Sequence, residues 1–110
     1  MARIFFADEN VRKEYEKLKN SSEYKELYRH IRNALEDIME NPQRCGIAIQ
    51  KRLIPDFYRK YGINNLFKYD LPAGWRLLYS IGKEGIEVIA IVLEWMNHKD
   101  YEKRFGYKVR

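Results

Sequence analysis

The chain has 110 residues, a formal net charge of +5 and an isoelectric point near 9.3. This length suits one domain with one core, so residues 1–110 are expected to form a single domain. No stretch reaches the apolar length of a membrane span, and the opening MARIFFADEN is too short in its apolar part for a signal peptide. Cys45 is the only cysteine, which excludes a disulfide framework within the chain and favours a reducing, cytoplasmic setting. The positive charge is compatible with a polyanionic partner but does not identify one.

The first part of the chain predicts a strand followed by two helices. Arg3 to Ala7 is a short apolar run typical of an opening strand. The stretch VRKEYEKLKN has helical spacing, with Asp8 as a candidate cap. A second apolar stripe begins after a polar break, with Ser22 as its expected cap, and ends at Asn41-Pro42. It consists of Tyr24, Leu27, Tyr28, Ile31, Leu35 and Ile38. Because the break is short, the two helices are expected to form an antiparallel hairpin.

Beyond Pro42 the apolar residues no longer recur at helical spacing. Residues 47–53 fit either a strand or an irregular rim, and residues 55–62 indicate a short helix or turn that closes at Gly62. A turn at residues 82–85 precedes residues 86–95, whose VIAIVL centre is apolar on both faces and predicts an interior strand.

The clearest hairpin lies between these segments. NLFKYDL and WRLLYSI flank Pro72-Ala73-Gly74, which predicts two antiparallel strands joined by a three-residue loop. In the implied register Asp70 faces Arg76 and Lys68 faces Leu78, so one face is apolar and the other carries Lys68, Asp70 and Arg76 together. The expected fold is therefore α+β, with an N-terminal strand and a helical hairpin packed on one side of a small, mainly antiparallel sheet.

The sequence contains no glycine-rich phosphate loop and no nucleophile elbow. His30 and His98 lie far apart and have no carboxylates at ligand spacing, so neither a metal site nor a cofactor is expected. His30 lies off the apolar stripe and is expected to be an exposed helical histidine.

The segment from His98 to Tyr101 directly follows the predicted interior strand. Histidine can move a proton near neutral pH, while Lys68, Lys99 and Arg76 can hold a phosphate and stabilise developing negative charge. RNA strand cleavage needs these functions, because a 2′-hydroxyl must lose its proton and attack the adjacent phosphate. The alternative is a solvated turn with Tyr101 packed against the core.

Two motifs together resemble the RelE/ParE superfamily of toxins from toxin-antitoxin modules. They are the hairpin Gly74-Trp75-Arg76-Leu77-Leu78-Tyr79 and the late apolar strand that ends in His98-Lys99-Asp100-Tyr101, and they follow a strand and two helices in the family's order. The resemblance covers nearly the whole chain. It implies a cytoplasmic, metal-independent and ribosome-dependent mRNA endoribonuclease that inhibits translation and is held inactive by a cognate antitoxin protein. The ParE branch of the superfamily implies the alternative, a non-catalytic protein such as a gyrase-directed toxin or an inactive relative.

The resemblance also assigns roles to residues. Arg76 matches the arginine that contacts the scissile phosphate in RelE-like ribonucleases, and Lys68 falls near the family's basic residue on the preceding strand. His98 matches a histidine that many members carry, Lys99 takes the place of an arginine, and Tyr101 takes the place of an aromatic residue. His98 or Lys68 is then the proton acceptor. The expected contacts to RNA are completed by cationic and aromatic residues at Lys51, Arg52, Trp75 and Arg104.

The sequence departs from the family pattern at three places. Asp70 stands near a position where the RelE protein has a second basic residue. Lys99 offers a point charge where arginine would offer a planar fork. The segment from Pro55 to Ile63 is longer than in the shortest members.

Overall fold

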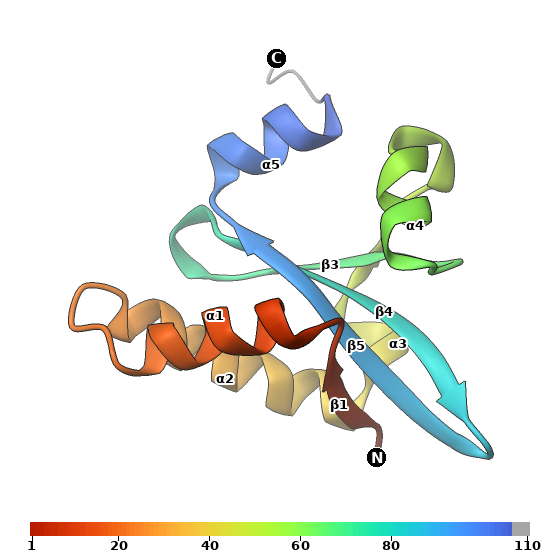
Figure 1. Cartoon of the computed structure of the whole chain (residues 1–110), viewed down its shortest axis with the longest axis horizontal. Helices are drawn as coiled ribbons and strands as arrows, with labels where there is room; N and C mark the ends of the chain where they lie inside the picture. The colour runs from red at the N-terminus through yellow and green to blue at the C-terminus, as the bar shows by residue number, and fades with distance from the viewer. Residues whose placement is uncertain (107–110) are drawn as a thin grey trace.

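The computed structural model describes residues 1–106 and has an α+β fold built on one five-stranded sheet (Figure 1). The strands are β1 (Arg3–Phe6), β2 (Ile47–Ala48), β3 (Phe67–Asp70), β4 (Arg76–Glu84) and β5 (Glu87–Met96). The helices are α1 (Glu9–Lys19), α2 (Lys25–Glu40), α3 (Pro42–Cys45), α4 (Pro55–Tyr61) and α5 (His98–Phe105). Short 3-10 turns lie at η1 (Lys51–Leu53) and η2 (Pro72–Gly74).

The sheet has the strand order β1-β5-β4-β3-β2, and only the pair of β1 and β5 is parallel. The expected interior position of the late apolar strand is confirmed, because β5 lies between β1 and β4. Leu78 pairs with Glu94 while Tyr79 pairs with Val92, so Leu93 is an extra residue that forms a β-bulge in β5. A bulge bends its strand, here just before the end from which α5 begins.

The helical hairpin of α1 and α2 covers one face of the sheet, as the sequence predicts. The buried stripe of α2 packs against inward side chains of β4 and β5, which together are Leu27, Ile31, Ala34, Leu35, Ile38, Leu77, Tyr79, Ala90 and Val92. The expected cap of α1 is confirmed, since Asp8 Oδ1 accepts from the Val11 N–H at 2.9 Å. The expected Ser22 cap of α2 is wrong. That helix begins only at Lys25, and the Ser21 hydroxyl accepts from the N–H of Tyr24 instead.

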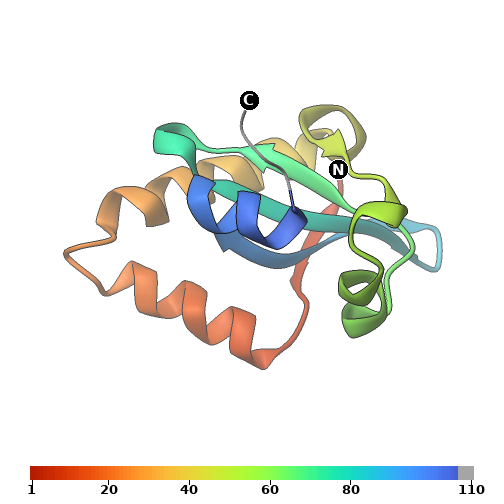
Figure 2. The same ribbon diagram turned by 90° about the horizontal axis from the view of Figure 1, so that it is seen from above.

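The opposite face of the sheet is also covered, by α4 and α5 (Figure 1). In the view from above, α5 lies in front of the central strands (Figure 2). A second core forms beneath these helices from Ile49, Phe57, Tyr58, Leu66, Leu78, Leu93, Met96, Tyr101 and Phe105. The predicted packing of the helical hairpin on one side of the sheet is confirmed, and the structure adds α4 and α5 on the other side.

The hairpin of β3 and β4 has the predicted register and loop. Asp70 pairs with Arg76 and Lys68 with Leu78, while the N–H of Leu71 donates to the carbonyl of Trp75 at 2.8 Å. In the loop, Ala73 (φ 61°) and Gly74 (φ 80°) both have left-handed backbone. The face that carries Lys68, Asp70 and Arg76 also carries the fully buried Leu78. This face is therefore apolar beneath α4 and α5 and polar only beyond these two helices.

Three further segments resolve or correct the expectations. The undecided stretch at residues 47–53 contains both a two-residue strand, β2, and the turn η1. The short helix expected at residues 55–62 is confirmed as α4, which ends at the left-handed Gly62. The turn expected at residues 82–85 is wrong, because β4 continues to Glu84 and the chain reverses at Gly85 and Ile86. Within residues 1–106, no helix is long and apolar enough to cross a lipid bilayer.

Candidate functional site

Three basic side chains from separate elements meet on the face of the sheet next to α5. They are Lys68 of β3, Arg76 of β4 and His98, the first residue of α5. Two carboxylates, Asp70 and Glu102, lie among them. We refer to these five residues as the basic cluster. Arg76 and His98 are 22 residues apart in sequence, so the fold rather than local sequence brings them together.

Asp70 links the two strand residues of the basic cluster. Lys68 Nζ lies 2.8 Å from Asp70 Oδ1 and 3.1 Å from Oδ2. Arg76 Nε lies 3.0 Å from the same Oδ1. The Arg76 Nε–H is not aligned with that oxygen, so this contact is an ion pair without a directed hydrogen bond. The side chains of Lys68 and Arg76 are mostly buried, whereas Asp70 is half exposed, so solvent reaches the cluster from the carboxylate side.

Arg76 is held in place by its own loop. Its Nη1 donates to the carbonyls of Gly74 and Trp75, at 2.9 and 3.2 Å. Its guanidinium carbon lies 5.5 Å from the ring centre of Tyr101, a cation–π distance. These contacts fix the guanidinium and leave Nη2 directed toward His98.

His98 lies between a cation and a carboxylate. Its Nδ1 is 3.3 Å from Arg76 Nη2, and its Nε2 is 2.9 Å from Glu102 Oε2. Because an arginine N–H can only donate, the first contact is a hydrogen bond when the imidazole is neutral and carries its proton on Nε2. In that tautomer the Nε2–H donates to Glu102 Oε2. The neighbouring turn is close, since a Cβ built on Gly74 would lie 3.3 Å from the His98 Cβ.

The segment that carries His98 is a helix, and the sequence contains a signal for it. The side chain of Asn97 accepts from the N–H of Asp100 at 2.8 Å, which is N-cap geometry. Tyr101 and Phe105 follow at helical spacing and are both buried, with ring centres 4.6 Å apart. The packing of Tyr101 against the core agrees with the alternative considered for this segment, although the segment is helical rather than a turn. Lys99 lies on the same helix and is exposed.

None of the four predicted RNA-binding residues belongs to the basic cluster. Lys51 is exposed, with Nζ 5.9 Å from the centre of the Tyr58 ring, and Arg52 Nε donates to Gln50 at 2.6 Å. Trp75 is partly buried and packs toward the helical hairpin, on the other face of the sheet.

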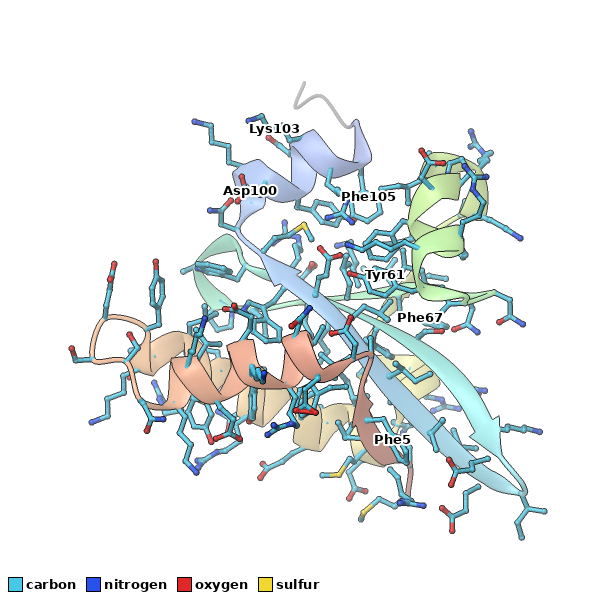
Figure 3. All side chains as sticks on the ribbon, in the orientation of Figure 1. Phe5, Tyr61, Phe67, Asp100, Lys103 and Phe105 are labelled. Atoms are coloured by element: carbon cyan, nitrogen blue, oxygen red, sulfur yellow. The ribbon has the colours of Figure 1, made fainter. Side chains whose placement is uncertain are left out.

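Arg104 is already engaged elsewhere, because its guanidinium donates to both carboxylate oxygens of Glu94 at 2.7 and 3.1 Å. Glu94 also accepts from the Tyr61 hydroxyl, which ties α4, β5 and α5 together. Burial raises the pKa of Glu94, but the hydrogen bonds from Arg104 and Tyr61 outweigh burial and hold the pKa below its ordinary value. Figure 3 shows Phe105 on the side of α5 toward α4 and Tyr61 at the lower end of α4, whereas Lys103 projects outward from α5.

Among residues 1–106, no group of three or more histidine, cysteine or acidic side chains is arranged to hold a metal ion. The chemistry that the basic cluster itself offers is phosphate binding by lysine and arginine and proton transfer by histidine.

The chain was compared with protein-family models, with curated proteins and with solved structures, and none of the three comparisons gave a match.

Proposed function

We propose that the protein is a RelE-like toxin that cuts mRNA on the ribosome. The observation that carries this proposal is the meeting of Lys68, Arg76 and His98 on one face of the sheet. These residues supply a cationic clamp for a phosphate and a group that can accept a proton. The hairpin and late-strand motifs, which resemble the RelE/ParE superfamily, contribute two of the three residues.

In the proposed reaction, His98 and Arg76 exchange their contact with each other for contacts with the RNA. When the scissile phosphate binds the Arg76 guanidinium, it competes for the Nη2 donor that otherwise contacts His98 Nδ1. The released nitrogen accepts the proton of the 2′-hydroxyl, and the 2′-oxygen forms a bond to phosphorus as the bond to the 5′-oxygen breaks. The Lys68 ammonium donates a proton to the leaving oxygen. The products are a 2′,3′-cyclic phosphate and a 5′-hydroxyl, and Glu102 stabilises the imidazolium through Nε2.

The test is a cell-free translation reaction with purified protein, with mRNA cleavage mapped by primer extension with and without ribosomes. We expect cuts only on ribosome-bound message, and we expect Arg76→Ala and His98→Ala to abolish them. Arg59→Ala is the matched control, because Arg59 is exposed and pairs only with Asp56 of its own helix among the described contacts. Undiminished cutting by both cluster variants would contradict the assignment.

One observation favours a second candidate, a non-catalytic binding protein of the same fold. Asp70 pairs with both Lys68 and Arg76, so a phosphate must compete with a carboxylate already in place. The Asp70→Asn variant separates the candidates. In a ribonuclease, removing this charge strengthens RNA binding, whereas in a purely structural cluster it leaves RNA binding unchanged and lowers stability. If the message stays intact in the translation assay, inhibition of gyrase supercoiling is the next measurement.

The proposal includes a cognate antitoxin as partner. Co-purification with the product of an adjacent reading frame is the expected result. Expression of the chain alone as a harmless monomer would count against this partner.

A further inference from the structure

A groove on the other side of the η2 loop differs in chemistry from the basic cluster. It has a volume of about 310 Å³ and lies between the first turns of α2 and the loop that joins β3 to β4. Figures 1 and 2 both show this loop beside the start of α2. The residues that line the groove are Glu23, Tyr24, Glu26, Leu27, His30, Pro72, Ala73 and Trp75.

The groove is lined by two carboxylates, Glu23 and Glu26, and by His30, but by no lysine or arginine, on a protein whose formal charge is +5. Glu26 pairs with Arg29, which is not among the lining residues, and the hydrogen bond from this guanidinium lowers the pKa of Glu26. Glu23 is exposed and makes no hydrogen bond or ion pair within the described part of the chain. A polyanion such as RNA would bring its phosphates toward both carboxylates, so electrostatics disfavour it here.

The aromatic lining complements the carboxylates. Tyr24 is 41% exposed, although most of the aromatic side chains in this protein are more deeply buried. Trp75 is partly buried, and its exposed part lines the same groove. Tryptophan and tyrosine faces attract cations, and a flat guanidinium both stacks on such a ring and pairs with a carboxylate.

We propose that this groove binds the guanidinium of an arginine side chain presented by a protein partner. Charge complementarity selects a cation, and the aromatic faces select the planar arginine head over the lysine ammonium. The occupant lies on the opposite face of the sheet from the basic cluster, although Trp75 directly precedes Arg76 in the chain. This interaction does not depend on ribonuclease activity.

The fluorescence of Trp75 reports the interaction directly. The chain has two tryptophans, so Trp95→Phe leaves Trp75 as the only indole. The probe is a blocked Gly-Arg-Gly peptide, and its control is the same peptide with citrulline, which is uncharged and nearly the same shape. We expect saturable quenching by the arginine peptide and binding of the citrulline peptide that is weaker by about tenfold, from lost ion pairing and cation–π attraction.

Two variants in the same Trp95→Phe background locate the site. Glu23→Gln is expected to weaken binding of the arginine peptide several-fold, while Glu36→Gln, on an exposed position of α2 outside the groove, is expected to leave it unchanged. Equal binding of the arginine and citrulline peptides, or absence of binding, would overturn the proposal. Stronger quenching by guanosine 5′-monophosphate than by the arginine peptide would also overturn it, and would make the groove a nucleobase site. Since no cleavage is measured, failure here leaves the proposed ribonuclease activity standing.

Discussion

Leu77 and Leu78 are adjacent in β4, point to opposite faces of the sheet, and are both fully buried. Leu77 packs in the core beneath α1 and α2, and Leu78 in the core beneath α4 and α5. Truncating either leucine to alanine removes buried apolar groups and leaves a cavity. The expected loss in the free energy of unfolding is about 2–5 kcal/mol for each variant.

Chemical unfolding in urea, followed by far-ultraviolet circular dichroism, measures these losses. Ile86→Ala is the control, because Ile86 is 98% exposed at the turn between β4 and β5, and its expected change is within about 0.5 kcal/mol. If Leu77→Ala shows its full loss while Leu78→Ala behaves like the control, the second core does not form. The placement of α5, and with it of His98 in the basic cluster, would then be refuted.

Three further outcomes are expected. Because hydrogen bonds lower the pKa of Glu94, its carboxylate stabilises the fold fully above the ordinary pKa of a free glutamate, about 4.3, and loses this contribution as the pH falls through the lowered value. The stability difference between wild type and Glu94→Gln should therefore shrink on acidification in thermal melts. Asp8→Ala removes the cap of α1 and should lower the free energy of unfolding by about 1 kcal/mol in urea titrations; no change would show that the cap is dispensable. Ala73→Gly relieves a left-handed alanine and should raise the melting temperature, by the equivalent of up to about 1 kcal/mol, and a lower melting temperature would contradict this account.

The sequence predicts the two helices of the hairpin, most of the residues that they bury against the sheet, and the register of β3 and β4. The reason is that the apolar stripe of α2 has an unambiguous period and the Pro72-Ala73-Gly74 loop permits only one pairing. The turn after β4 was misplaced because Gly82 resembles a turn residue. The structure uses it within the strand, where an added Cβ would meet Ile89 and Ile91 only at ordinary contact distance.

The second core could not be predicted because its members are scattered. Met96 is the last residue of β5, and Tyr101 and Phe105 follow in α5, but their partners Phe57 and Tyr58 lie in a short segment with no clear period of its own. The sequence placed Asp70 opposite Arg76 and on the same face as Lys68, which the structure confirms, but it did not predict Glu102 as the partner of His98. The Asn97 cap and the spacing of Tyr101 and Phe105 were the available signal for α5.

The parallel pairing of β1 with β5 has a kinetic consequence. Arg3 pairs with Ile89, and Phe6 with Val92, so within residues 1–106 the first strand pairs only with a strand more than 80 residues later in the sequence. Contacts between residues so distant in sequence slow folding, because a long loop must close before they form. During synthesis, β1 must wait until β5 has been made, and His98 follows β5. A growing chain therefore lacks the basic cluster until both β5 and His98 have been made.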